Sequence, residues 1–247
     1  MRPVPVALPS GTPVLDAGQG TAFSPTRLPF VPQAVFFDLD GTLADTAADL
    51  AAPVNAMRAE RGLEPMPLAS LRPWASMGAR GLIGQGLGIA PGHEDYERLR
   101  LDFLARYEAA MCVHTRLFEG MAELLDGLEA HGIAWGVVSN KVERYVRPIL
   151  AELGLLRRCA GAIGGDTTPH PKPHPEPLLH AARLARVTPE RCLYVGDDHR
   201  DVQAGRAAGM ITVAAAYGYC GAEPAPAAWG ADHLVASPHD LHPLLLT

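Results

Sequence analysis

The sequence predicts an α/β fold: a doubly wound, Rossmann-like parallel sheet core with a helical cap domain inserted after the first strand. From about residue 33 onward, short apolar runs that end in polar residues alternate with helical stretches. That alternation is typical of a parallel sheet with right-handed crossovers. Between about residues 51 and 118 the alternation stops, and helix-like segments occur with no convincing strand. We therefore expect a second, smaller helical domain over one end of the sheet.

The elements follow in chain order. Residues 1–32 carry Pro and Gly every few positions without periodicity, so we expect a flexible tail. Strands are expected within QAVFFDLD, IAWGVVSN, CAGAIGGD, CLYVGDD and ITVAAAYG. Core helices are expected over Gly120–His131, Val142–Leu153, Pro175–Ala185 and Asp201–Ala208, and cap helices around Ala51–Arg61, Arg80–Leu87 and Asp95–Met111. The predicted division is 33–50 and 119–247 for the core and 51–118 for the cap.

The composition is that of an ordinary soluble globular protein, with 48% hydrophobic and 19% charged residues in a chain of 247. The net charge of −6 and the lack of a basic block argue against a nucleic acid partner. No apolar run approaches the roughly 18 residues of a membrane span. Four scattered cysteines without metal-site spacing suit a reducing, cytoplasmic location. Nothing in the sequence distinguishes a monomer from a homodimer.

Lysine is rare in this chain. The sequence contains 21 basic residues, and Lys141 and Lys172 are its only lysines. Two lysines retained in so arginine-rich a chain suggest positions that need a compact ammonium group rather than a guanidinium, although coincidence explains them equally well.

Polar side chains follow several of the expected strands. In open α/β sheets the ligand site lies outside the carboxyl ends of the strands. The groups expected there are Asp38, Asp40, Ser139, Asn140, Lys172, Asp197, Asp198 and Asp201. Asp38 and Asp40 are two residues apart on a strand, so both side chains face the same side. A cluster of carboxylates at one site requires a cation, and oxygen ligands favour Mg²⁺.

This set of groups suits phosphoryl transfer. A metal ion and an ammonium group neutralise the phosphoryl oxygens while a carboxylate attacks in line. A second carboxylate can protonate the leaving alkoxide and later activate water. Gly41 allows a sharp backbone turn, and Thr42 adds a hydroxyl near the expected phosphate position.

Four ordered motifs, DLDGT, VVSN, KP and GDDHRD, resemble those of the haloacid dehalogenase-like phosphatases, over about residues 33–247. The resemblance implies that Asp38 is the nucleophile and Asp40 the general acid/base. It also implies that Ser139 binds the phosphoryl group and that Lys172 balances its charge. Mg²⁺ would be held by Asp38, the Asp40 carbonyl and Asp197, with Asp201 in support.

Other interpretations of individual residues stay open. Ser139 and Asn140 can cap the helix expected over 142–153, alone or in addition to a site role. Lys172 can be an ordinary loop lysine, and Lys141 is either a substrate contact or a surface lysine. Asp198 and His199 are expected to be structural or solvent-facing, and His170 and His174 to be solvated loop histidines.

The residues also separate the reactions that such a fold hosts. Asp40 argues against a dehalogenase, which needs no acid at that position. Residues 51–118 contain no lysine, which argues against a phosphonatase that forms a Schiff base in the cap. A sugar-phosphate mutase shares the core motifs and remains an alternative. A non-catalytic regulatory relative would not need all four motifs together.

The stretches FDLDGTLADTAADL, GAIGGD, KPHPEPLL and YGYCG are similar to the phosphoglycolate phosphatase group. Within that group, LFEGMAELL and YGYCGAEPAPAAWGADHLV resemble N-acetylmuramic acid 6-phosphate phosphatases more closely. Both implied substrates are small phosphate esters with a carboxylate. Arg80, in the Gly-rich stretch Leu71–Gly88, is a candidate partner for that carboxylate or else a surface arginine. Trp74 is either a pocket wall or part of the cap core.

Overall fold

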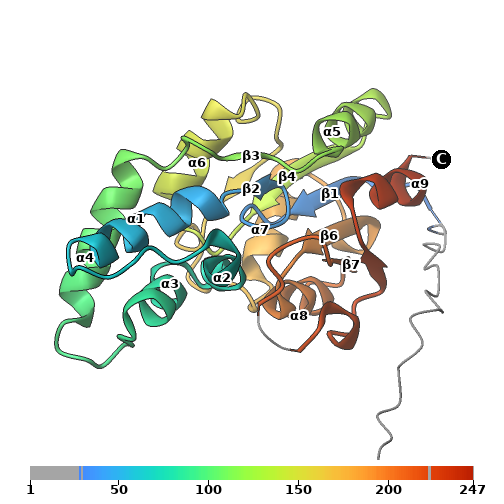
Figure 1. Cartoon of the computed structure of the whole chain (residues 1–247). Coiled ribbons are helices and arrows are strands. Elements are labelled where there is room, and N and C mark those ends of the chain that lie inside the picture. The colour runs from blue at the N-terminus through green and yellow to red at the C-terminus, as the bar shows by residue number, and fades with distance from the viewer. Residues whose placement is uncertain (1–27, 29, 222–223, 247) are drawn as a thin grey trace, which may run out of the picture.

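A computed structural model describes Leu28, residues 30–221 and residues 224–246 of the chain (Figure 1). Its centre is a six-stranded parallel sheet with the strand order β5–β4–β1–β6–β7–β8. The strands are β1 (Ala34–Phe37), β4 (Ala134–Val138), β5 (Ala162–Ile163), β6 (Cys192–Gly196), β7 (Ile211–Ala215) and β8 (His233–Val235). From β1 the chain first adds β4 and β5 on one side and then β6, β7 and β8 on the other side. This is the doubly wound arrangement, and it confirms the predicted fold class.

Helices connect these strands on both sides of the sheet. The core helices are α5 (Met121–Ala130), α6 (Glu143–Glu152), α7 (Glu176–Ala185), α8 (His199–Ala207) and α9 (Leu241–Leu245). Short 3₁₀ helices are η2 (Pro189–Arg191), η3 (Pro226–Ala228) and η4 (Pro238–Asp240). In Figure 1, α5 and α9 lie above the sheet and α8 lies below it.

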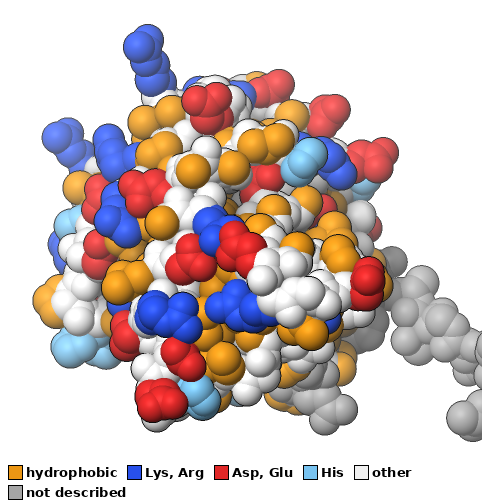
Figure 2. Space-filling model, turned by 60° about the vertical axis from the view of Figure 1, so that its left-hand side comes forward, with side chains coloured by type: hydrophobic (Ala, Val, Ile, Leu, Met, Phe, Trp, Pro, Cys, Tyr) orange, Lys and Arg blue, Asp and Glu red, His pale blue; other side chains and the backbone are white. Residues whose placement is uncertain are grey.

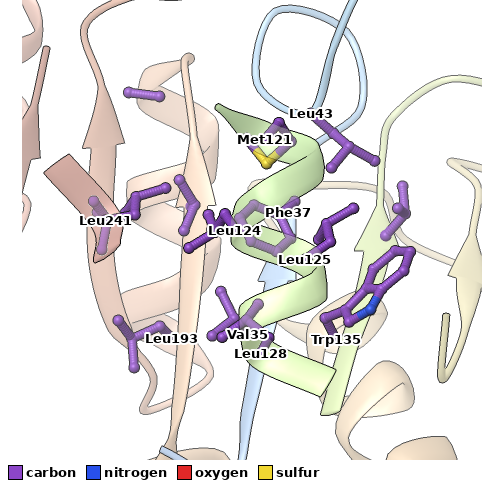
Figure 3. Close-up of a cluster of buried hydrophobic side chains, with 14 of the residues drawn as sticks. Val35, Phe37, Leu43, Met121, Leu124, Leu125, Leu128, Trp135, Leu193 and Leu241 are labelled. Atoms are coloured by element: carbon purple, nitrogen blue, oxygen red, sulfur yellow. The ribbon is translucent and has the colours of Figure 1, made fainter. Parts of the chain in front are cut away.

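Alternation along β1 divides the apolar core between the two faces. Val35 and Phe37 point to the face covered by α5, α6 and α9, where Leu124 and Leu125 of α5 pack against them (Figure 3). Phe36, between them in the sequence, points to the opposite face, which α7 and α8 cover. Because β1 is buried on both faces, its side chains are apolar at every position. The strand is thereby fixed at the middle of the sheet, and its carboxyl end is fixed with it.

Four helices form a separate group beside the sheet, on the left in Figure 1. They are α1 (Ala47–Ala59), α2 (Leu68–Leu71), α3 (Gly78–Leu87) and α4 (Tyr96–Ala109), with the 3₁₀ helix η1 (Arg72–Met77) between α2 and α3. We call them the α1–α4 bundle. They share their own apolar cluster, which includes Val54, Leu82 and Phe103. The chain enters and leaves the bundle through a two-stranded antiparallel sheet, β2 (Ala44–Asp45) with β3 (Arg116–Leu117).

The element predictions differ from the structure in a few places. The strand β8 was not expected, and β3 lies inside the stretch in which no strand was expected. The predicted flexible tail lies mostly outside the described residues. At its end, Leu28 is buried in the core and the Phe30 ring lies under the Arg191 guanidinium, with 4.7 Å between guanidinium carbon and ring centroid. Packing against the core therefore begins before residue 33.

Figure 2 turns the α1–α4 side of the molecule toward the reader. Acidic and basic side chains are interspersed with hydrophobic ones over this face. Among the described residues, no helix combines the length and the apolar character that crossing a membrane requires.

The packing of α5 on the sheet predicts a measurable difference between two leucines. Leu125 is fully buried in the core, whereas Leu101 on α4 is 59% exposed. We expect Leu125→Ala to lower the free energy of unfolding by about 3 kcal/mol, because it removes apolar contacts and leaves a cavity. Leu101→Ala should change it by no more than about 0.5 kcal/mol. Urea unfolding of the two variants measures both values, and equal losses would contradict this account of the core.

Candidate active site

The carboxyl ends of the strands open into a cavity of about 240 Å³ between the sheet and the α1–α4 bundle. Asp38 follows β1, Ser139 follows β4, and Lys172 lies in the loop after β5. All three line the cavity, together with Asp40 and Asp201. Strand-end residues far apart in the sequence therefore meet at one place, as the parallel topology requires.

Lys172 is the centre of the buried polar network. Its ammonium group lies 2.7 Å from Asp201 Oδ1 and 3.1 Å from Asp38 Oδ1, and it donates to the Tyr194 hydroxyl at 2.7 Å. Burial opposes its charge, but Asp201 and Asp38 outweigh burial and raise the pKa of the ammonium. Asn140 fixes the Lys172 backbone, since its side chain accepts from Lys172 N–H and donates to Lys172 C=O, both at 2.9 Å. Lys172 is thus held charged and in place.

Asp197, fully buried, has only neutral partners. Its carboxylate accepts hydrogen bonds from the Thr42 hydroxyl and the Tyr219 backbone N–H, both at 2.8 Å. Gly41 makes this arrangement possible: its φ is +89°, and a Cβ there would lie 2.2 Å from Asp197 Oδ2. Burial, followed by the charges of Asp38 and Asp201, raises the pKa of Asp197 above the usual range. The site therefore contains a carboxyl group with no cation beside it among the described residues.

The three carboxylates together have the composition of a divalent cation site. Asp38, Asp197 and Asp201 each offer an oxygen, and these oxygens lie within 4.8 Å of one another. Lys172 supplies one positive charge to this group. Burial raises the pKa of Asp201 as well, with Lys172 opposing the shift and Asp38 adding to it. Three buried carboxylates with one ammonium leave two negative charges, which a divalent cation with oxygen ligands would neutralise.

Asp40 lies on the other side of the cavity with partners of its own. The Lys141 ammonium donates to both of its oxygens at 3.0 Å, and the Thr46 hydroxyl donates to Oδ1 at 2.5 Å. Lys141 has a side-chain exposure of 8%, so it is not a surface lysine. Burial opposes the charge of the ammonium, but Asp40 and Tyr107 together outweigh burial and raise the pKa of Lys141. The Thr46 backbone N–H in turn donates to the Tyr219 hydroxyl at 2.7 Å.

The two oxygens of Asp38 have different surroundings. Oδ1 accepts from the Leu39 backbone N–H at 2.7 Å and contacts Lys172. Within the described chain, Oδ2 takes part in no hydrogen bond. Nearby, the Ser139 hydroxyl accepts from the Lys141 N–H at 3.2 Å and retains its own proton for a ligand. Asp38 therefore presents one fixed and one free oxygen to the cavity.

The α1–α4 bundle supplies the opposite wall of the cavity. Ser76, Met77, Gly78 and Ala79 contribute from η1 and the start of α3. Arg80, the next residue, is exposed and does not line the cavity. Trp74 packs against the apolar cluster of the bundle, which places it in the core rather than in the wall.

Three further interpretations can now be decided. Neither Ser139 nor Asn140 caps α6: the N-cap position is Val142, and no side chain caps it. Asp198 is structural, because its carboxylate accepts from the Arg200 N–H and forms the N-cap of α8 in a capping box with Asp201. His170 and His174 are exposed, as expected of loop histidines, with ring centroids 4.6 Å apart.

The sequence analysis did not identify two residues of the site, Tyr194 and Arg200. Tyr194 donates to the Val138 C=O at 2.7 Å and so completes the surroundings of Lys172. A tyrosine hydroxyl inside a strand buried on both faces needs a partner, and this was an available clue. Arg200 lines the cavity while paired with Asp198 at 2.7 Å, and its side chain also donates to the Ser76 C=O at 3.1 Å.

Comparison with known proteins agrees with this geometry. The family model "Haloacid dehalogenase-like hydrolase" matches residues 35–215. A phosphoglycolate phosphatase of Xanthomonas campestris pv. campestris (strain 8004) is 49% identical over 213 residues, which cover 85% of this chain and 95% of that protein. An N-acetylmuramic acid 6-phosphate phosphatase of Pseudomonas putida is 45% identical over 213 residues, which cover 86% and 96%.

Solved structures extend the similarity to the fold. The crystal structure of a predicted phosphoglycolate phosphatase from Haemophilus somnus superposes with a TM-score of 0.74 at 27% identity, covering 85% of this chain and 96% of that one. A phosphatase structure from Clostridium difficile has a TM-score of 0.77 at 18% identity, which shows a shared fold alone. With the family model matching most of its length and curated phosphatases nearly half identical to it, this chain belongs to the haloacid dehalogenase-like hydrolases and is a phosphatase of that family.

Proposed function

We propose that the protein hydrolyses a small, carboxylate-bearing phosphate monoester with Mg²⁺ bound, through an aspartyl-phosphate on Asp38, and that the substrate is N-acetylmuramic acid 6-phosphate. The observation that carries the mechanism is the surroundings of Asp38: one oxygen is fixed by Leu39 N–H and Lys172, and the other is free. A carboxylate held in this way is oriented for attack without being neutralised. The acidic cluster of Asp38, Asp197 and Asp201 would hold the metal.

The first step forms the bond between Asp38 Oδ2 and phosphorus and breaks the bond from phosphorus to the ester oxygen. The electron pair of the broken bond stays on the leaving oxygen, which takes a proton from Asp40. Lys172 and the Ser139 hydroxyl stabilise the phosphoryl oxygens in this step. Bound Mg²⁺ supplies further charge neutralisation of the phosphoryl group.

The second step reverses the role of Asp40. Its carboxylate removes a proton from a water molecule, whose oxygen attacks phosphorus while the bond to Asp38 breaks. Lys141 and Thr46 hold Asp40 by three hydrogen bonds in the structure. Because Lys141 occupies both oxygens, its contact must loosen when Asp40 carries the proton. We therefore assign Lys141 as a positioning residue for Asp40.

The wall of the cavity supports the choice of substrate. Beyond its charged end, the cavity is lined by apolar groups, among them Leu50, Phe103, Leu104 and Met77. An alcohol of two carbons would leave this surface without a partner, whereas an amino sugar with acetyl and lactyl groups offers apolar as well as polar contacts. The Pseudomonas putida relative, by its name, acts on that sugar phosphate.

A second candidate is 2-phosphoglycolate. The Xanthomonas campestris relative that shares 49% of its residues is named for that activity. The carboxylate of 2-phosphoglycolate is compatible with the three cationic side chains that line the cavity among the described residues, Lys141, Lys172 and Arg200. Both candidates use the same chemical steps and differ only in the alcohol part.

The substrate assignment is tested by phosphate release from the two esters with Mg²⁺ present. We expect kcat/KM for N-acetylmuramic acid 6-phosphate to exceed that for 2-phosphoglycolate by at least about tenfold, because apolar contacts in the wall stabilise the larger alcohol part. Phenyl phosphate, which offers a hydrophobic leaving group without a carboxylate, serves as the reference ester. The reverse preference would assign the protein to phosphoglycolate.

The nucleophile is tested by Asp38→Asn. We expect kcat to fall by at least about 10³-fold, because an amide neither attacks phosphorus nor forms the acyl phosphate. The substitution barely changes the volume, so the melting temperature should stay near that of the parent protein. Asp126→Asn, at a side chain 70% exposed, is the matched control and should retain full activity. Activity of Asp38→Asn within tenfold of the parent would refute the covalent mechanism.

The metal assignment is tested by thermal unfolding with and without Mg²⁺ at pH 6 and pH 8. The raised pKa of Asp197 means that the metal-free folded protein holds protons which the unfolded chain releases, so its stability falls as the pH rises above the usual aspartate range. Protons compete less with the metal at pH 8. We therefore expect a larger stabilisation by Mg²⁺ there, about 3 to 6 °C near tenfold the Kd.

Two variants make the metal experiment specific. Asp197→Asn replaces one carboxylate oxygen by an amide nitrogen and removes the negative charge, and should abolish most of the Mg²⁺ stabilisation. Asp126→Asn has the same chemistry at an exposed position and should retain it. An equal gain in melting temperature for both variants would mean that the metal binds elsewhere.

A further inference from the structure

Tyr107, near the end of α4, is a buried tyrosine whose hydroxyl makes no close hydrogen bond among the described residues. The Lys141 ammonium makes a looser contact with this hydroxyl, and because an ammonium group can only donate, the hydroxyl keeps its own proton free to donate. The residue is 2% exposed and lines the active-site cavity. Buried hydroxyl groups in folded proteins nearly always have a partner. A hydroxyl that lacks a close one at the wall of a ligand cavity is therefore placed for a group on the ligand.

The position of Tyr107 identifies which part of the ligand this is. The Lys141 ammonium lies 4.7 Å from the centroid of the Tyr107 ring and also donates to both oxygens of Asp40. Tyr107 is thus joined through one side chain to the residue that protonates the leaving alkoxide. Asp38 and Lys172, which the proposed reaction places at the phosphoryl group, belong to a different network. The hydroxyl accordingly lies on the alcohol side of the cavity.

Neighbouring residues provide a contrast. The ring of Tyr145 packs edge-on against Tyr107 with centroids 5.6 Å apart, and its hydroxyl is engaged by the Arg144 guanidinium at 2.6 Å. Phe103 and Leu50, which line the same wall, have no polar atoms in their side chains. In such apolar surroundings a single hydrogen bond to a ligand has a large effect on which ligand binds.

We propose that Tyr107 is a specificity-determining residue whose hydroxyl donates a hydrogen bond to a carboxylate or amide oxygen on the alcohol part of the phosphate ester, an assignment that rests on the proposed phosphatase reaction. Burial, opposed in part by Lys141, raises the pKa of Tyr107 to about 12, so the hydroxyl retains its proton at neutral pH. A neutral phenol can donate to the acceptor oxygens that both candidate substrates carry.

The test is Tyr107→Phe, which removes only the hydroxyl. For the better of the two candidate esters we expect kcat/KM to fall about tenfold, equivalent to about 1.4 kcal/mol. The inhibition constant of inorganic phosphate, which has no alcohol part, should stay within about twofold. The melting temperature should change little, because the hydroxyl makes no close hydrogen bond within the protein and its contact with Lys141 is a loose one. A structural role would lower the melting temperature and weaken phosphate binding along with activity.

Tyr96→Phe is the matched control, since Tyr96 is a buried tyrosine on the same helix that does not line the cavity. It should leave kcat/KM for the same ester unchanged. An unchanged kcat/KM in Tyr107→Phe, or a fall accompanied by an equal loss of phosphate inhibition, would overturn the inference while the phosphatase reaction stands. Parent protein that releases phosphate from neither candidate ester would instead overturn the proposed substrate class, and the inference with it.

Discussion

The crowding of three buried carboxylates around one ammonium group is the constraint on which the rest of the site depends. Asp38, Asp197 and Asp201 place three negative charges where water is largely excluded, and Lys172 balances one of them. In a medium of low dielectric constant this arrangement favours either bound protons or a divalent cation. The raised pKa of Asp197 is the sign of the first state, and the oxygen-rich cluster is the requirement of the second. The mutual repulsion of these carboxylates therefore favours the binding of a divalent cation.

The surrounding backbone is shaped to hold these charges close together. Gly196 ends β6 beside Asp201, and a Cβ at this glycine would lie 2.3 Å from Asp201 Oδ2. Asp201 also accepts from the Asp198 N–H at 3.0 Å, so the start of α8 contributes a backbone donor to the cluster. Hydrogen bonds from backbone N–H groups stabilise carboxylates without adding mobile side chains. The close approach of strand and helix thus results from the electrostatic requirement as much as from packing.

Whether the position of a site residue could be predicted depends on which contacts determine that position. Asp38 and Lys172 could be placed because the carboxyl ends of parallel strands meet at one edge, whatever the loops do. Arg80 could not, because its orientation depends on how α3 is rotated against the sheet, and it turned out to be exposed. Lys141 was left undecided because it lies in the loop between β4 and α6, and its burial depends on contacts with Asp40 and Tyr107 that are distant in the sequence. Tyr107 gave no signal, since a tyrosine on an amphipathic helix has the pattern of an ordinary core residue. The strand β8, three residues long, is too short for periodicity to reveal.

The two lysines of the chain show how the site is divided. In the proposed reaction Lys172 would serve the phosphoryl end, where its ammonium joins Asp38 to Asp201. Lys141 would serve the alcohol end, where it contacts Asp40 of the sheet edge and the Tyr107 ring of the α1–α4 bundle. An ammonium group has three donors and no fixed plane, so it can contact a carboxylate and an aromatic face at the same time. The planar guanidinium of arginine could be oriented for only one of these two contacts. Because Lys141 connects Asp40, the proposed acid/base residue, with the wall proposed to contact the alcohol, a poorly fitting alcohol would disturb both at once. Selectivity would then appear in the chemical step as well as in binding.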